Sequence, residues 1–155
     1  MTDVQVGVVD VYVVRASVRP WRVLALQRAA NGTRCPNSWE TVAGRIEPGE
    51  RPADAAVREL FEETGLAVER LYNVTVQPFY LHRLDTVQMA VVFAAFVGEP
   101  ATVALGPEHQ ASEWLSVSDA AARFAWPRER EALDHIVRLF GNGDAGPLED
   151  VLRVR

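Results

Sequence analysis

Three glutamates, Glu59, Glu62 and Glu63, stand close together in a segment rich in helix-forming residues. Successive residues of an α-helix are rotated by about 100°, so Glu63 projects from nearly the same side as Glu59, and Glu62 lies about 60° from Glu59. Like charges at this spacing destabilise a helix unless a cation balances them. Hard cations such as Mg²⁺ prefer carboxylate oxygens, and no histidine or cysteine stands near enough in the sequence to favour zinc or copper. The pattern therefore predicts a site for a divalent metal ion.

Arg58 stands directly before the first of these glutamates and four residues before Glu62. Its charge offsets part of the cluster, and its guanidinium can hold Glu50 across the preceding turn in a bidentate pair. Gly44 lets the backbone pass close to the metal and present carbonyl oxygens to it. An Arg-Glu-x-x-Glu-Glu segment alone is also typical of a solvated helix face. The metal hypothesis therefore depends on the spacing of the whole segment.

Local signals predict the elements that hold this segment in place. Pro52 suits the first position of a helix, Asp54 complements the helix dipole, and Gly65 is a natural stop, which together predict a helix over residues 52–64. Valine-rich and alternating segments predict strands at residues 4–14, 21–27, 39–43, 71–81, 87–97 and 113–117. This irregular mixture predicts an α+β fold, or a sheet sandwiched by helices.

The last part of the chain predicts two helices and then a break. Ser118 can cap a short helix over residues 119–123, and an amphipathic helix follows from Pro127 to Phe140. The glycine-rich stretch that comes next predicts a flexible tail over residues 141–155. The sequence leaves open whether the final residues dock as a strand or stay loose.

The composition limits the kinds of protein that these residues can belong to. The chain has 155 residues, 48% hydrophobic and 24% charged, which predicts a single globular domain over residues 1–155. No apolar run approaches the roughly 20 residues of a membrane helix, and Asp3 stands where a signal peptide would be basic. We therefore expect a cytoplasmic protein that does not bind membranes. The net charge of −5 argues against polymeric nucleic acid as a partner, and the single Cys35 excludes an internal disulfide and a cysteine-rich zinc site.

The spacing of the whole segment resembles the Nudix box, G-x5-E-x7-R-E-U-x-E-E-x-G-U, in which U is an aliphatic residue. Every specified position is filled, by Gly44, Glu50, Arg58, Glu59, Leu60, Glu62, Glu63, Gly65 and Leu66. The order of strands and helices around the box is also similar to that of a Nudix hydrolase. The resemblance implies an α/β/α sandwich with a central mixed β-sheet.

The resemblance also implies a role for each residue of the box. Glu59, Glu62 and Glu63 would bind Mg²⁺ or Mn²⁺, helped by the backbone carbonyl of Ala43. Glu50 would support Arg58 by pairing with it, and Gly44 and Gly65 would shape the backbone on either side. Members of the family cleave a phosphoanhydride in substrates that contain a nucleoside diphosphate linked to another group, and metal ions activate the water that attacks phosphorus. The general base would be one of the box glutamates or an acid from a later loop.

Residues outside the box resemble the branch of dihydroneopterin triphosphate and dATP pyrophosphohydrolases. The segment from Trp39 to Gly44 enters the box as in that branch, and Glu108 is followed by His109 and a Glu-Trp-Leu sequence. In that branch an acid at the position of Glu108 contributes to the metal or base site; an ordinary loop glutamate is the other interpretation. Three further side chains are candidates for stacking on a pterin or a nucleobase through aromatic and cation–π contacts, with core packing as the other interpretation: Trp39, Tyr80 and Arg83.

The leading hypothesis is therefore a Mg²⁺-dependent pyrophosphohydrolase that releases pyrophosphate from a (deoxy)nucleoside triphosphate or from dihydroneopterin triphosphate. Its partner would be this small molecule, and the sequence leaves open a monomer or a homodimer. ADP-ribose and dinucleoside polyphosphates are the alternative substrates in the same family. A non-catalytic nucleotide-sensing module is an alternative of another class. An isomerase of isoprenoid diphosphates would want a cysteine beside a glutamate, and Cys35 is a poor candidate.

Overall fold

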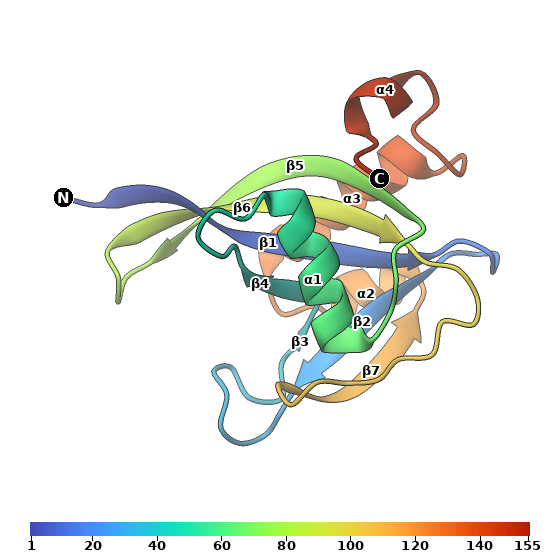
Figure 1. The fold of residues 1–155 in the computed structure, drawn as a ribbon. Helices are drawn as coiled ribbons and strands as arrows, with labels where there is room; N and C mark the ends of the chain where they lie inside the picture. The colour runs from blue at the N-terminus through green and yellow to red at the C-terminus, as the bar shows by residue number, and fades with distance from the viewer.

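The computed structural model describes all residues 1–155 and contains one mixed sheet of seven strands (Figure 1). The strands are β1 Asp3–Arg15, β2 Arg22–Arg28, β3 Trp39–Glu40, β4 Val42–Arg45, β5 Arg70–Leu81, β6 Thr86–Phe96 and β7 His109–Leu115. They lie in the order β3-β2-β1-β6-β5, with β4 beside β1 and β7 beside β2. β1 and β6 are parallel, and the other pairs are antiparallel. A strand is found at each position predicted from the valine-rich and alternating segments, with ends that differ by up to four residues.

Helices cover both faces of this sheet (Figure 1). They are α1 Pro52–Thr64, α2 Val117–Arg123, α3 Pro127–Phe140 and α4 Glu149–Leu152, the last preceded by a 3₁₀ turn at Gly146–Leu148. α1 lies on one face, and α2 and α3 lie on the other. The predicted α+β fold, an α/β/α sandwich around a mixed sheet, is confirmed. No helix is long and apolar enough to cross a membrane.

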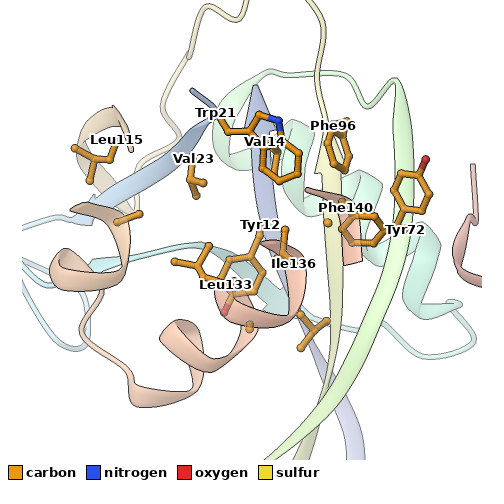
Figure 2. Packing of buried hydrophobic residues seen from close by; sticks show 14 of the residues in the cluster. Tyr12, Val14, Trp21, Val23, Tyr72, Phe96, Leu115, Leu133, Ile136 and Phe140 are labelled. Atoms are coloured by element: carbon orange, nitrogen blue, oxygen red, sulfur yellow. The ribbon is translucent and has the colours of Figure 1, made fainter. Parts of the chain in front are cut away.

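Alternation along the central strand divides the core into two layers, because successive side chains of a strand point to opposite faces. Val11 and Val13 are fully buried and pack in the layer beneath α1. Tyr12 and Val14 are equally buried and pack in the layer beneath α3, where Figure 2 shows them among aromatic side chains. In that layer the ring centroids of Tyr72 and Phe140 lie 4.6 Å apart, so aromatic packing holds the C-terminal end of α3.

The bounds of α1 follow from the local signals in the sequence. Pro52 stands at the start of the helix and Asp54 lies in its first turn. Gly65 has a φ of 71°, and its N–H bonds the carbonyl of Phe61, which ends the helix in the left-handed conformation that glycine adopts most readily. The helix predicted over residues 52–64 is therefore confirmed at both ends.

Two local predictions were wrong in detail. The strand predicted over residues 39–43 is split at Thr41, because the chain changes partner there: β3 pairs with β2, whereas β4 pairs with β1. The hydroxyl of Thr41 donates to the carbonyl of Val11 at the change of partner. The cap of α2 is Ser116 and not Ser118, since the Ser116 hydroxyl accepts the N–H of Asp119 at 3.1 Å.

The segment after α3 lies against the edge strand β5. Arg153 forms a bridge with Tyr72, and the N–H of Val154 donates to the carbonyl of Leu71 at 2.8 Å. Arg155 also forms an ion pair with Asp54 in the first turn of α1. The C-terminal residues therefore contact β5 through backbone hydrogen bonds and the start of α1 through one ion pair.

Candidate active site

The second half of α1 and the loop before β7 enclose a polar cleft of about 210 Å³. The cleft has no hydrophobic side chain in its wall and is lined by Glu59, Glu62, Glu63, Gly106, Pro107, Glu108 and His109. Three glutamates come from one helix because their spacing places them on neighbouring faces. Glu108 comes from a loop more than 40 residues later in the sequence. The structure thus brings the predicted carboxylates of the box and of the later loop together.

Gly44 matters here for its lack of a side chain. A Cβ atom at Gly44 would lie 2.0 Å from the carboxyl carbon of Glu59. The carboxylate of Glu59 therefore rests against the backbone of β4, in space that any other residue would fill. The sequence predicted that Gly44 lets the backbone pass close to the site, and in the structure the carboxylate of Glu59 occupies the space next to this backbone.

Arg58 joins the turn before α1 to the carboxylates. Its Nε and Nη2 donate to the two oxygens of Glu50 at 2.8 and 2.9 Å, in the bidentate pair that the sequence predicted. Its Nη1 donates to Glu59 at 2.8 Å and to Glu62 at 3.2 Å, and Nη2 also donates to the carbonyl of Arg45. The hydrogen bonds that Glu50 accepts from Arg58 and from the backbone N–H of Glu47 lower the pKa of Glu50 to about 2. Arg58 thus fixes the position of two cleft carboxylates.

Glu63 is the most buried carboxylate of the cleft, with 7% of its surface exposed. Its Oε2 accepts the backbone N–H of Ala43 at 3.2 Å. Burial is the main cause that raises the pKa of Glu63 to about 9, and the charges of Glu59 and Glu40 add to it. Burial also raises the pKa of Glu59, although the hydrogen bond from Arg58 opposes this shift. Glu63 therefore favours its neutral form unless a cation lies beside it.

The chemistry of these donors suits a hard divalent cation, which takes oxygen ligands. The carboxylates are not yet arranged around one point: no three acidic, histidine or cysteine side chains lie at the spacing that a single ion requires. Arg58 instead spans Glu59 and Glu62. The residues of the cleft suit a divalent cation by their oxygen atoms, their burial and their charge, and Gly44 leaves room for the carboxylate of Glu59.

The loop that carries Glu108 is attached to the end of α1. The N–H of Gly106 donates to the carbonyl of Glu63 at 3.3 Å, and that of Ala104 donates to Thr64 at 2.8 Å. The charge of Glu108 contributes to the raised pKa values of Glu59 and Glu63, so it acts on the same site. Glu108 itself is exposed at the cleft.

The three side chains predicted to contact the substrate do not line this cleft. Trp39 packs against the core layer beneath α3, with the Arg123 guanidinium 4.8 Å from its ring. Tyr80 bonds Asp85 at 2.9 Å in the turn between β5 and β6, and Arg83 is exposed in the same turn. That turn lies beside the N-terminus, at the end of the sheet away from the cleft (Figure 1). The length of the β5–β6 hairpin carries Tyr80 and Arg83 away from the cleft, and the sequence alone does not show where the tip of this hairpin lies.

One residue close enough to Glu63 to raise the pKa of that side chain was missed as a site residue. Glu40 is buried in β3, and its Oε1 accepts from Nη1 of Arg28 at 2.9 Å. The same oxygen lies 2.9 Å from Nε2 of His109, which follows Glu108. A charged residue inside a short buried strand just before the box is the signal that could have drawn attention to Glu40.

A larger groove of about 1020 Å³ lies elsewhere, between α2, α3 and the turn before β2. Its wall includes Trp21, Val117 and Leu133 and shares no residue with the cleft. It holds a single carboxylate, that of Asp134, so size does not locate the carboxylate chemistry in this chain.

Comparison with known proteins places the chain in a family. A family model described as the NUDIX domain matches residues 3–136. An octanoyltransferase from Myxococcus xanthus is 40% identical over 97 residues, which cover 61% of this chain and 27% of that protein. A putative nudix hydrolase 1 from Caenorhabditis elegans is 28% identical over 134 residues, which cover 85% of this chain and 34% of that protein. The chain therefore spans about a third or less of the length of these curated relatives.

Solved structures agree on the fold. The dihydroneopterin triphosphate pyrophosphohydrolase of E. coli superposes with a TM-score of 0.69 at 23% identity, over 89% of this chain and 99% of that chain. At this level of identity the likeness establishes the fold alone.

Proposed function

Because the chain belongs to the NUDIX domain family, we propose that it hydrolyses a phosphoanhydride bond in a substrate built on a nucleoside diphosphate. The observation that carries the proposal is the single polar cleft in which Glu59, Glu62, Glu63 and Glu108 meet. A non-catalytic module could dispense with these carboxylates, whereas here the full set is present, and burial raises the pKa values of Glu59 and Glu63.

Glu59, Glu62 and Glu63 would hold the divalent cation, Mg²⁺ or Mn²⁺, with the backbone of Ala43 at the edge of the set. When bound, the cation supplies charge that polarises the phosphoryl oxygens and makes water more acidic. Arg58 keeps two of the carboxylates in place, and Glu50 keeps Arg58 in place. Arg58 thus holds these two carboxylates within the cleft before a cation or a substrate binds, which lowers the cost of arranging them around the cation.

The proton of the attacking water needs an acceptor, for which the sequence left a box glutamate or a later acid open. We assign it to Glu108. Glu63 is buried and bonded to Ala43, and Glu59 and Glu62 are bonded to Arg58. Glu108 comes from the separate loop and is exposed to the cleft. It is thus the carboxylate with the freest approach to a water molecule.

For the substrate we propose a (deoxy)nucleoside triphosphate or dihydroneopterin triphosphate, cleaved to release pyrophosphate. The support is the sequence around the site, namely the segment that enters the box at Gly44 and the Glu-His pair at residues 108–109. The same fold in the E. coli dihydroneopterin triphosphate pyrophosphohydrolase is compatible with this choice.

The test is a Mg²⁺-dependent assay of product release from triphosphates, ADP-ribose and dinucleoside polyphosphates. We expect pyrophosphate from the triphosphates, little activity in EDTA, and loss of most turnover in Glu63→Gln. Glu131→Gln, which changes an exposed glutamate on α3, serves as the control and should behave like the wild type. Equal turnover by wild type and Glu63→Gln would refute the mechanism. Tight nucleotide binding without hydrolysis would identify a sensing module instead.

A further inference from the structure

We propose that Glu40 is a positioning residue: it holds the ring of His109 and thereby fixes the loop that presents Glu108 to the cleft. This role depends on the proposed function of the cleft and adds to it a buried support that lies outside the Nudix box. Glu40 belongs to β3, His109 begins β7, and both strands pair with β2. The support therefore ties together three strands at the point where the Glu108 loop enters the sheet.

The contact between Glu40 and His109 is the one hydrogen bond of the histidine ring. The side chain of His109 is completely buried, and its Nε2 donates to Oε1 of Glu40 at 2.9 Å. Its Nδ1 is also buried and has no partner. A buried polar ring with a single hydrogen bond depends heavily on that bond for its orientation. Removing the acceptor would leave both ring nitrogens unpaired.

Arg28 holds Glu40 from the other side. Its Nη1 donates to the same Oε1 at 2.9 Å, and its Nε donates to the carbonyl of Arg34. The backbone of Arg28 pairs with that of His109 in the sheet. Arg28, Glu40 and His109 therefore form a closed set, in which each is linked to the other two through a side chain or the backbone.

The strand register transmits this arrangement to Glu108. Gln27 pairs with Ala111 and Arg28 pairs with His109, so Gln110 is an extra residue in β7. Such a bulge changes the direction of neighbouring side chains. The N–H of Ala29 donates to the carbonyl of Glu108 at 2.9 Å, which fixes the backbone directly before the strand. Glu108 lies in the turn directly before β7, so the fixed ring of His109 and this backbone hydrogen bond together hold Glu108 at the cleft.

The cost of Glu40 also favours a functional role. It places a further negative charge near Glu63, inside a region that already has an excess of carboxylates. Burying an ion pair such as Arg28–Glu40 rarely stabilises a protein more than an apolar pair of the same size would. A residue that only filled space in β3 would have no need of this charge. A fixed acceptor for His109 does need an oxygen at this position.

The decisive experiment measures kcat and KM for Glu40→Ala, Glu40→Gln, Glu108→Gln and the double variant Glu40→Ala/Glu108→Gln. A misplaced catalytic group costs up to about 100-fold, so we expect Glu40→Ala to lower kcat by about 10- to 100-fold, with a change in KM below about threefold. Glu40→Gln should keep most of the activity, because its amide oxygen still accepts from His109 and Arg28. The double variant should be no slower than Glu108→Gln, because Glu40 acts through Glu108. Additive losses, or equal damage by Gln and Ala, would overturn the proposal.

A second measurement does not depend on turnover. Amide hydrogen exchange at residues 104–110 should become faster in Glu40→Ala, remain unchanged in Glu40→Gln, and stay unchanged throughout α1 in both variants. If the wild type hydrolysed no substrate, the proposed function would fail, and exchange would still decide whether Glu40 positions the loop. Unchanged exchange in Glu40→Ala would overturn the positioning role. If Glu40→Ala does not fold, His109→Phe, which keeps a buried ring without the hydrogen bond, should show the same faster exchange, and protection equal to the wild type would refute the role.

Discussion

Both faces of the sheet bury carboxylates, and they balance them in different ways. Beneath α3, Glu129 accepts the N–H of Thr41 at 2.7 Å and that of Trp126 at 3.1 Å, and Asp10 pairs with Arg128 at 3.0 Å. Beneath α1, Glu63 accepts one N–H and otherwise faces other carboxylates.

The difference separates architecture from function. The carboxylate of Glu129 accepts the backbone N–H of Trp126, the N-cap residue of α3, and that of Thr41, so its contacts explain the helix position. One oxygen of Asp10 and the Tyr12 hydroxyl lack partners, but the charge of Asp10 has a guanidinium beside it. The α1 side gathers four carboxylates around one cleft, and Arg58 contacts only two of them. A site for a divalent cation would use this surplus of carboxylates.

The largest expected effect that tests this comparison is the dependence of stability on pH and Mg²⁺. Burial raises the pKa of Glu129 to about 8 and that of Glu63 to about 9. The folded state favours the protonated form of each, so their stabilisation is complete below the unfolded value of about 4.5 and is lost as pH rises through 8 and 9. Each pKa unit is worth about 1.4 kcal/mol, which predicts a fall of several kcal/mol without divalent cation.

Urea unfolding at pH 5 to 9 measures this fall. Mg²⁺ should remove the part that belongs to Glu63, and Glu129→Gln should remove the other part. The comparison between the two faces is wrong if Mg²⁺ leaves the pH dependence of the unfolding free energy unchanged. It is also wrong if Mg²⁺ reduces the contributions of Glu63 and Glu129 equally.

The next effect concerns the close approach at Gly44. Gly44→Ala should displace the carboxylate of Glu59 and lower kcat/KM by about 100-fold, while the free energy of unfolding changes by less than about 1 kcal/mol, because only the end of a flexible side chain must move. The control is Gly7→Ala, where a Cβ would lie 2.6 Å from the amide oxygen of Gln88 and away from the cleft. Steady-state kinetics of both variants measure the loss of kcat/KM, and thermal melts measure the change in stability. Equal activity in the two variants would contradict the role of Gly44.

On the other face, Glu129→Ala should lower the free energy of unfolding by about 2 kcal/mol, because two buried N–H groups lose their acceptor and α3 loses its cap. The affinity for Mn²⁺, measured by calorimetry, should stay as in the wild type. Glu131→Ala, an exposed change in the same helix, should be within about 0.5 kcal/mol of the wild type. A large loss of Mn²⁺ affinity in Glu129→Ala would show that the two faces are not independent.

The smallest effect compares the two arginines. Arg58→Lys keeps the charge but loses the fork that binds Glu50, so we expect about a tenfold loss of activity and little change in melting temperature. Arg128→Lys loses its bond to Asp10 and should lower the melting temperature with little effect on Mn²⁺ affinity. If both substitutions change the same observable, the division between the faces is wrong.

Local chemistry explains why much of the fold and the box could be predicted from sequence. Pro52 and Gly65 carry the bounds of α1 in their own backbone preferences. The ion pair of Glu50 with Arg58 joins the turn before α1 to the helix itself, and it depends on the spacing of two residues within one segment. The arrangement of the carboxylates on α1 follows from helical geometry alone.

The rest depends on where strands pair. The change of partner at Thr41 and the position of the β5–β6 turn, with Tyr80 and Arg83, are set by neighbours distant in sequence. The contact of Glu40 with His109 joins residues 69 apart, and nothing near either residue indicates it. The approach of Arg58 to Glu62 could be foreseen from their spacing, but its simultaneous bond to Glu59 could not.

The parallel pairing of β1 with β6 has a consequence for how the molecule is made. It joins Asp3–Val14 to Thr86–Phe96, so the centre of the sheet can close only after Phe96 has left the ribosome. Pairings between such distant segments slow folding, because a long loop must be closed first. α1 lies within that loop and can form early from its own signals. A nascent chain would thus carry an acidic helix long before β7 and the Glu108 loop assemble beside it.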